Sequence, residues 1–173
     1  MEGRKGIDED DAESAIAYFT GRKDTDPTFY FEYDVDSEER LNNLFWSNAQ
    51  PQVDYKYFSV VSVFDFIYNT NEYHKPLVVL TGVNNHFETI VFGSALVSYE
   101  SIEAYKWVIN ALVQAMDGKR PMSVLIDGDK SMRRAIENVL PEAKHRLCSW
   151  HLAKMQKLIA KNVILSCKCL INL

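Results

Sequence analysis

The chain of 173 residues is 47% hydrophobic and 25% charged, so it has the length and apolar content to bury the core of one domain. No run of about 18 apolar residues occurs and the charged N-terminus has no hydrophobic segment, so we expect neither a membrane span nor a secretory signal. The three clustered cysteines, Cys148, Cys167 and Cys169, do not suggest a disulfide framework and favour an intracellular, reducing compartment.

The net charge of −5 hides an opposition between the two ends of the chain. Residues 1–54 carry 14 acids against 5 bases, whereas residues 119–173 carry 4 acids against 11 bases. A basic segment can neutralise phosphates and release their counterions, which drives nucleic-acid binding. The same pattern also arises on an ordinary solvated helix face, and the acidic N-terminal part would repel DNA.

The first 54 residues divide into two parts. Residues 1–27 are expected to form an acidic arm with a short helix at 11–19, closed by the break at Asp26-Pro27. Residues 28–54 contain two runs rich in aromatic and apolar residues, 28–33 and 40–46, on either side of a polar turn. This pattern predicts a β-hairpin ahead of the main domain.

Three β-branched and aromatic runs follow, at 58–65, 76–83 and 88–97. Short, turn-forming connectors join them, so we expect antiparallel neighbours. Apolar residues then recur at helical spacing over 101–116 and 129–139, on either side of a short strand at 124–126. A second short strand that ends at Cys148 and a helix over about 150–161 complete the pattern.

This order of elements predicts an α/β fold with a ribonuclease-H-like mixed sheet. Three antiparallel strands come first, and the later strands join in parallel through crossover helices. We expect this domain at residues 55–161, incomplete at its C-terminus, followed by a divergent tail at 162–173 to which we assign no function.

Two aspartates are expected at the ends of neighbouring strands. Asp65 would end the first strand of the domain and Asp127 the fourth, at the edge where open α/β sheets present functional groups. Carboxylates are the ligands that Mg²⁺ and Mn²⁺ prefer, and paired ions about 4 Å apart serve phosphodiester cleavage. The alternative is that both aspartates only begin turns, where Asp is a favoured residue.

Cys148 and His151 form a Cys-x-x-His pair, which ligates Zn²⁺ when a second pair closes the tetrahedron. No second pair has the usual spacing, so the alternative is a buried cysteine and a histidine that caps the next helix. Four cations of the basic segment are the candidate contacts to a nucleic-acid backbone. They are Lys130, Arg133, Arg134 and Arg146.

Short motifs spread over residues 12–158 occur in the order in which one family of plant proteins has them. They are Phe29-Tyr-Phe-Glu-Tyr33 with Arg40-Leu-Asn-Asn-Leu-Phe-Trp46, Phe64-Asp-Phe-Ile-Tyr68, Gly82-Val-Asn84 with His86, Phe92-Gly-Ser-Ala-Leu96, Ile126-Asp-Gly-Asp129, and His145-Arg-Leu-Cys-Ser-Trp-His151. Together they resemble the FAR-RED IMPAIRED RESPONSE and FAR-RED ELONGATED HYPOCOTYL family, which is domesticated from Mutator-like transposases.

The resemblance implies a ribonuclease-H-like transposase domain. In it, Asp65 and Asp127 match the first two members of an acid triad, and Cys148 and His151 match the family's Cys-x-x-His segment. Family members are nuclear and act in transcription, largely in light signalling. The implied partners are therefore DNA and other regulators, with neither a membrane nor a small-molecule substrate.

The sequence departs from the family at the acid site. Phe66 and Ile67 replace two threonines after Asp65, and the family's third acid lies downstream of the point where this chain ends. The family's zinc-binding segments are not found either. We therefore expect a truncated, transposase-derived regulator that needs no cofactor and acts without catalysis. The alternatives are a residual metal-dependent nuclease that takes its third acid from Glu137 or Glu142, and a dimerisation module without nucleic-acid contact.

Overall fold

The computed structural model describes residues 7, 9–58, 61–67, 73–83, 86 and 88–147, with the backbone alone at 58, 61 and 65–67. Within these residues the elements follow one another as α1 (Glu9–Thr25), β1 (Tyr30–Val35), β2 (Leu41–Ser47), α2 (Ala49–Phe58), β3 (Val61–Ile67), β4 (Leu77–Val83), β5 (Thr89–Val97), α3 (Ile102–Ala115), β6 (Ser123–Ile126), α4 (Lys130–Val139) and β7 (Lys144–Leu147). The helix predicted at 150–161 and the tail at 162–173 lie outside the described residues. None of the helices in the described ranges has the length and apolar character that crossing a membrane requires.

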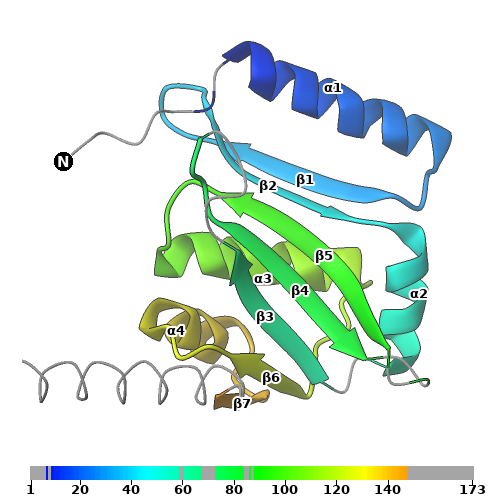
Figure 1. Ribbon diagram of the computed structural model, residues 1–173, viewed down its shortest axis with the longest axis vertical. Coiled ribbons are helices and arrows are strands. Elements are labelled where there is room, and N and C mark those ends of the chain that lie inside the picture. The colour runs from blue at the N-terminus through cyan, green and yellow to red at the C-terminus, as the bar shows by residue number, and fades with distance from the viewer. Residues whose placement is uncertain are drawn as a thin grey trace, which may run out of the picture.

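All seven strands of the described chain belong to one sheet, in the order β1-β2-β5-β4-β3-β6-β7 (Figure 1). Strands β3, β4 and β5 pair antiparallel, and β2 pairs antiparallel with β5, so the predicted hairpin of β1 and β2 extends the same sheet. On the other side, β6 joins β3 in parallel and β7 joins β6 in parallel. The predicted α/β class with a mixed sheet is confirmed, and the strand order agrees with a ribonuclease-H-like arrangement.

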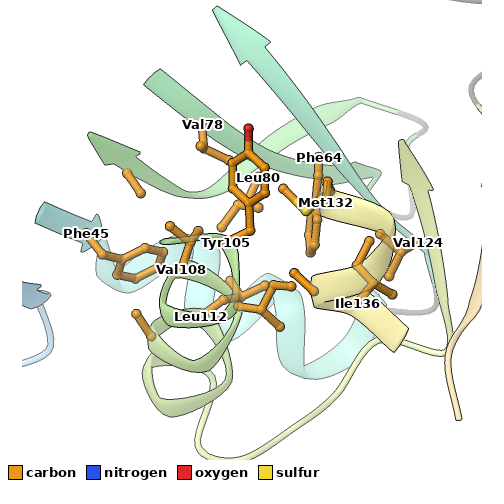
Figure 2. Close-up of a cluster of buried hydrophobic side chains, with 14 of the residues drawn as sticks. Phe45, Phe64, Val78, Leu80, Tyr105, Val108, Leu112, Val124, Met132 and Ile136 are labelled. Atoms are coloured by element: carbon orange, nitrogen blue, oxygen red, sulfur yellow. The ribbon is translucent and has the colours of Figure 1, made fainter. Parts of the chain in front are cut away.

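Helices α3 and α4 cover one face of the sheet, which is the rear face in Figure 1. Both helices have the apolar stripe that the sequence predicts, and these stripes meet the inward-facing side chains of the strands in one continuous core. The core residues labelled in Figure 2 are Phe45, Phe64, Val78, Leu80, Tyr105, Val108, Leu112, Val124, Met132 and Ile136, all of which are fully buried. Truncation of one such side chain to alanine typically costs about 2–5 kcal/mol.

Helix α1 packs against the opposite face, at the hairpin end of the sheet (Figure 1). Its Phe19 ring stacks between aromatic rings of the hairpin region, with centroids 5.8 Å from Phe29 and 5.4 Å from Trp46. This small aromatic cluster is separate from the main core. It fixes the helix that the sequence predicts at 11–19, which the structure extends in both directions.

Helix α2 is absent from the sequence-based prediction. Its Pro51 lies in the first turn, where a missing N–H costs nothing, and Asn48 precedes it, so two start signals were present. The helix buries Tyr55 against Phe92, with ring centroids 4.7 Å apart in an edge-to-face arrangement. Burial raises the pKa of the Tyr55 hydroxyl to about 12, so it stays protonated at an alkaline pH where an exposed tyrosine ionises.

Strand β3 begins and ends later than predicted. The sequence places a strand at 58–65, but α2 extends to residue 58 and β3 pairs with β4 as far as Ile67 opposite Leu77. Asp65 therefore lies within β3, paired with Val79, rather than at its last residue. Apolar residues pair between β3 and β4 on both sides of Asp65, so the strand continues past the aspartate that was predicted to end it.

The interior strand β5 contains a glycine that no larger residue can replace without a clash. A Cβ added at Gly93 would lie 2.6 Å from Cζ of Phe45 and 3.2 Å from the carbonyl oxygen of Trp46. We expect Gly93→Ala to lower the free energy of unfolding by about 1–3 kcal/mol, because the core must shift to admit the methyl group. Urea unfolding followed by circular dichroism measures this change.

Gly21 of α1 is the matched control, because a Cβ added there meets no atom within 4 Å. Gly21→Ala should raise the free energy of unfolding by about 0.5–1 kcal/mol through helix propensity alone. A Gly93→Ala protein as stable as the parent would contradict the packing described for β5.

Candidate functional site

The loop after β6 is built around Asp127. Strand β6 ends at Ile126, and Oδ1 of Asp127 accepts a hydrogen bond of 3.0 Å from the backbone N–H of Asp129. Between them Gly128 adopts φ +106°, a conformation that favours glycine. The aspartate therefore turns the chain at the end of the strand, as the structural alternative predicted, and its half-buried carboxylate stays at this edge of the sheet.

Asp129 then begins α4 as its N-cap. Its Oδ1 accepts a hydrogen bond of 2.7 Å from the backbone N–H of Met132, while its own backbone remains extended. Met132 is buried against the sheet, so the cap also fixes the entry of the helix into the core. The loop is thus held by two successive aspartates, each of which accepts from a backbone N–H further along the chain.

The register of β3 and β6 brings Asp65 and Asp127 to corresponding positions. Val61 lies opposite Ser123, and Val63 opposite Leu125, in a parallel ladder that advances one residue at a time. Continued for two further residues, the same register would bring Asp65 level with Asp127, the residue that follows β6. Adjacent strands are about 5 Å apart, so this register keeps the two backbones near each other.

The two glutamates considered as a third acid lie elsewhere. Glu137 is eight residues beyond Asp129 on α4, about 12 Å along the helix at 1.5 Å per residue. Its Oε1 accepts a hydrogen bond of 3.0 Å from Nε of Arg133 and lies 3.6 Å from Nε2 of His145 on β7. Glu142 is exposed and lines a pocket with Ser123, at the opposite end of β6 from Asp127.

The four cations proposed for nucleic-acid contact do not share one surface. Lys130, Arg133 and Arg134 are exposed on α4, and their spacing of three and four residues places them on one side of the helix. Arg146 is exposed on β7, where it pairs with Leu125, whereas its neighbour His145 faces Glu137 of α4. Because strand side chains alternate, Arg146 extends from the face of the sheet opposite α4.

The ion pair between Arg133 and Glu137 was not singled out from the sequence, although its spacing of four residues was a readable signal. Lys130 and Arg134 of the same helix form no ion pair within the described residues. The predicted zinc ligands Cys148 and His151 lie outside the described residues. In the described part of the chain, no group of three His, Cys, Asp or Glu side chains is arranged to hold a metal ion.

Comparison with known proteins decides the family. Residues 61–155, from the start of β3 to beyond β7, match the MULE transposase domain family. Protein FAR-RED IMPAIRED RESPONSE 1 from Arabidopsis thaliana is 35% identical over 146 residues, which cover 84% of this chain and 18% of that protein. The chain belongs to the FAR1-related family of domesticated transposases. The resemblance noted in the sequence is thereby confirmed.

Two further relatives from Arabidopsis thaliana support this assignment. Protein FAR1-RELATED SEQUENCE 4 is 34% identical over 146 residues, covering 84% of this chain and 20% of its own length. Protein FAR1-RELATED SEQUENCE 2 is 30% identical over 154 residues, covering 88% of this chain and 19% of its own length. The chain thus spans about a fifth of the length of these relatives, centred on the MULE domain.

The N-cap of α4 gives a direct test of how the Asp127 loop is held. Asp129→Ala should lower the free energy of unfolding by about 1 kcal/mol, because the N–H of Met132 loses its acceptor. Asp129→Ser, which keeps an acceptor oxygen, should stay within a few tenths of a kcal/mol of the parent protein. Chemical denaturation measures both variants, and equal stability of Asp129→Ala and Asp129→Ser would contradict the capping role.

Proposed function

We propose that this chain is a nuclear transcription regulator that acts through association with DNA or with other regulators and not through strand cleavage. The MULE domain and its relatives among the FAR1-related proteins support descent from a transposase. The observation that carries the non-catalytic proposal is the position of the remaining acids. Glu137 is engaged by Arg133 at a distance from Asp127, and Glu142 lies at the other end of β6.

A metal-dependent nuclease is the rival function. Its active site would need a further carboxylate beside Asp65 and Asp127, since several acidic ligands must converge on the ions. If the chain is a nuclease, the parent protein should nick supercoiled DNA in the presence of Mg²⁺ or Mn²⁺, and the Asp127→Asn variant should not. Our proposal predicts that the parent protein and Asp127→Asn leave the DNA equally intact.

The exposed side of α4 is the surface that we propose for contact with the DNA backbone. Lys130 and Arg134 are four residues apart and exposed, so both can reach one phosphate strand. Arg133 contributes less to this surface, because its guanidinium is paired with Glu137. Light signalling and the choice of promoter follow from the family alone and belong to the same proposal.

Salt dependence of DNA binding tests the surface of α4. Binding of the chain to a DNA duplex should weaken linearly on a plot of log affinity against log salt concentration. Lys130→Gln and Arg134→Gln should each reduce the slope by about 1, because each removes one phosphate contact. Lys56→Gln on α2, an exposed cation away from α4, is the control with the same change of charge and should leave the slope unchanged.

An unchanged slope in both α4 variants would contradict this surface. Self-association of the chain that persists at high salt, without any DNA dependence, would instead favour the dimerisation module.

Nuclear localisation is tested separately with a fluorescent fusion too large to diffuse through nuclear pores, and exclusion from the nucleus would overturn that part of the proposal.

We also propose that Asp65 and Asp127 retain weak affinity for Mg²⁺ or Mn²⁺. Their oxygen donors suit these ions, and the register of β3 and β6, continued by two residues, supports their proximity. Mn²⁺ should therefore broaden the backbone NMR signals of the loop from Asp127 to Asp129, and Asp127→Asn should remove the effect. Glu142→Gln removes the same charge at the other end of β6 and should preserve the broadening. Broadening that survives in Asp127→Asn would contradict the site.

A further inference from the structure

A second polar site lies between the hairpin and the beginning of α3. A pocket of about 530 Å³ opens there, walled by Asp34 of β1, Asn43 of β2, and Glu103 and Trp107 of α3. These elements lie at the end of the sheet remote from β6, so the pocket is independent of the Asp127 loop. Nothing in the transposase-derived function accounts for it.

Asn43 is the buried polar residue in the wall of this pocket. It is 3% exposed, and it lies directly opposite Asp34 in the β1–β2 ladder. Its backbone N–H donates to Oδ1 of Asp34 at 2.7 Å, and its Nδ2 donates to Oδ2 of Asp34 at 3.1 Å. Because a carboxylate only accepts hydrogen bonds, Asp34 fixes which end of the amide is the donor.

The same geometry leaves the amide oxygen of Asn43 without a donor. No residue in the described part of the chain hydrogen-bonds to Oδ1 of Asn43, although this atom is shielded from solvent. Because solvent does not reach this atom, the polar group of the β1–β2 pair that is open to a ligand is the half-buried carboxylate of Asp34.

The charges of the pocket also favour a donor ligand. Glu103 is paired with Lys106 at 3.1 Å, whereas the half-buried Asp34 forms no ion pair with any described residue. Each carboxylate oxygen of Asp34 can accept beyond the bond from Asn43. The first turn of α3 does not offset this charge, because Ser101 caps the N–H of Ala104 and Glu103 is itself an acid.

Aromatic side chains complete the wall. The ring of Tyr99 is already engaged by the ammonium of the buried Lys75, 5.4 Å from its centroid. Trp107, half-buried in the same pocket, offers a second ring of the type that attracts cations best. An anionic ligand such as phosphate would meet Asp34 and is disfavoured.

We propose that this pocket binds an arginine side chain presented by a partner peptide. A guanidinium is planar and carries five N–H donors, so it can donate to the carboxylate of Asp34 while it stacks on Trp107. A lysine ammonium is more strongly hydrated and lacks the planar fork. The chain then carries a protein-recognition site at the hairpin end of the sheet, separate from any contact with nucleic acid.

The experiment is an NMR titration of the full chain with the tripeptide acetyl-Gly-Arg-Gly-amide. Saturable shifts are expected at the backbone amides of Asn43 and Ser101, and at the side-chain amide of Asn43. Asp34→Asn should weaken binding about tenfold, because a charge-assisted hydrogen bond is lost. Glu142→Gln removes the same charge at a distant, exposed position and should bind as the parent does.

A second variant keeps the test valid if Asp34→Asn does not fold. Asn110 is exposed on α3 and lines the same pocket, so Asn110→Arg should place a guanidinium in the site and block the peptide. Arginine is a good helix former, so circular dichroism should be unchanged.

The proposal is overturned if the arginine peptide causes no saturable shift, or if both variants bind it as the parent does. It is also overturned if the lysine analogue binds as tightly as the arginine peptide. Because none of these readouts involves DNA or metal, failure here leaves the proposed regulatory function standing.

Discussion

The parallel pairing of β3 with β6 is the constraint on which the rest of the structure depends. It joins segments about 60 residues apart in the sequence, and α3 and α4 are buried against the face that it completes. A shift of one residue would turn Val124 and Ile126 away from that core, because strand side chains alternate between faces. The same shift would separate Asp65 from Asp127. Packing and the position of the acids are therefore fixed by one register.

This coupling explains how a transposase-derived frame could persist under the proposed non-catalytic function. The register is held by buried apolar residues, which folding needs whether or not a metal ion binds. Asp127 and Asp129 also serve the backbone of their loop, since each accepts an N–H hydrogen bond. The presence of these acids is consequently compatible with a scaffold, and activity must be argued from the complete set of ligands at the site.

Much of the fold could be predicted from the sequence because its long elements carry clear periodicity. Helix α3 and strands β4 and β5 lie within about a residue of the predicted ranges, and the N-cap of α4 was readable at Asp129. Helix α2 was missed because Tyr55 is the one large side chain that it buries among its described side chains, so it lacks an obvious stripe. The end of β3 was predicted too early because Asp65, a single polar residue, does not end the pairing with β4, which continues to Leu77.

The two candidate sites, the Asp127 loop and the pocket around Asn43, also differ in how far the sequence could predict them. The parallel pairing of β3 with β6, which relates Asp65 to Asp127, could be predicted from topology, although Asp65 lies within β3 and not at its end. The pocket around Asn43 could not, because it combines residues of β1, β2 and α3 that no local pattern links. Its chemical character also depends on Asp34 forming no ion pair within the described residues, which is a property of the folded surface.

The mode of attachment of α1 has a consequence for how the molecule moves. This helix rests on the hairpin through a small aromatic cluster, and Ala12 is its buried residue, whereas α3 buries seven. Regions with few buried contacts open at a lower free-energy cost than the whole domain. Helix α1 should therefore detach while the sheet stays intact, exchanging its amide hydrogens early and uncovering the aromatic face of the hairpin for brief intervals.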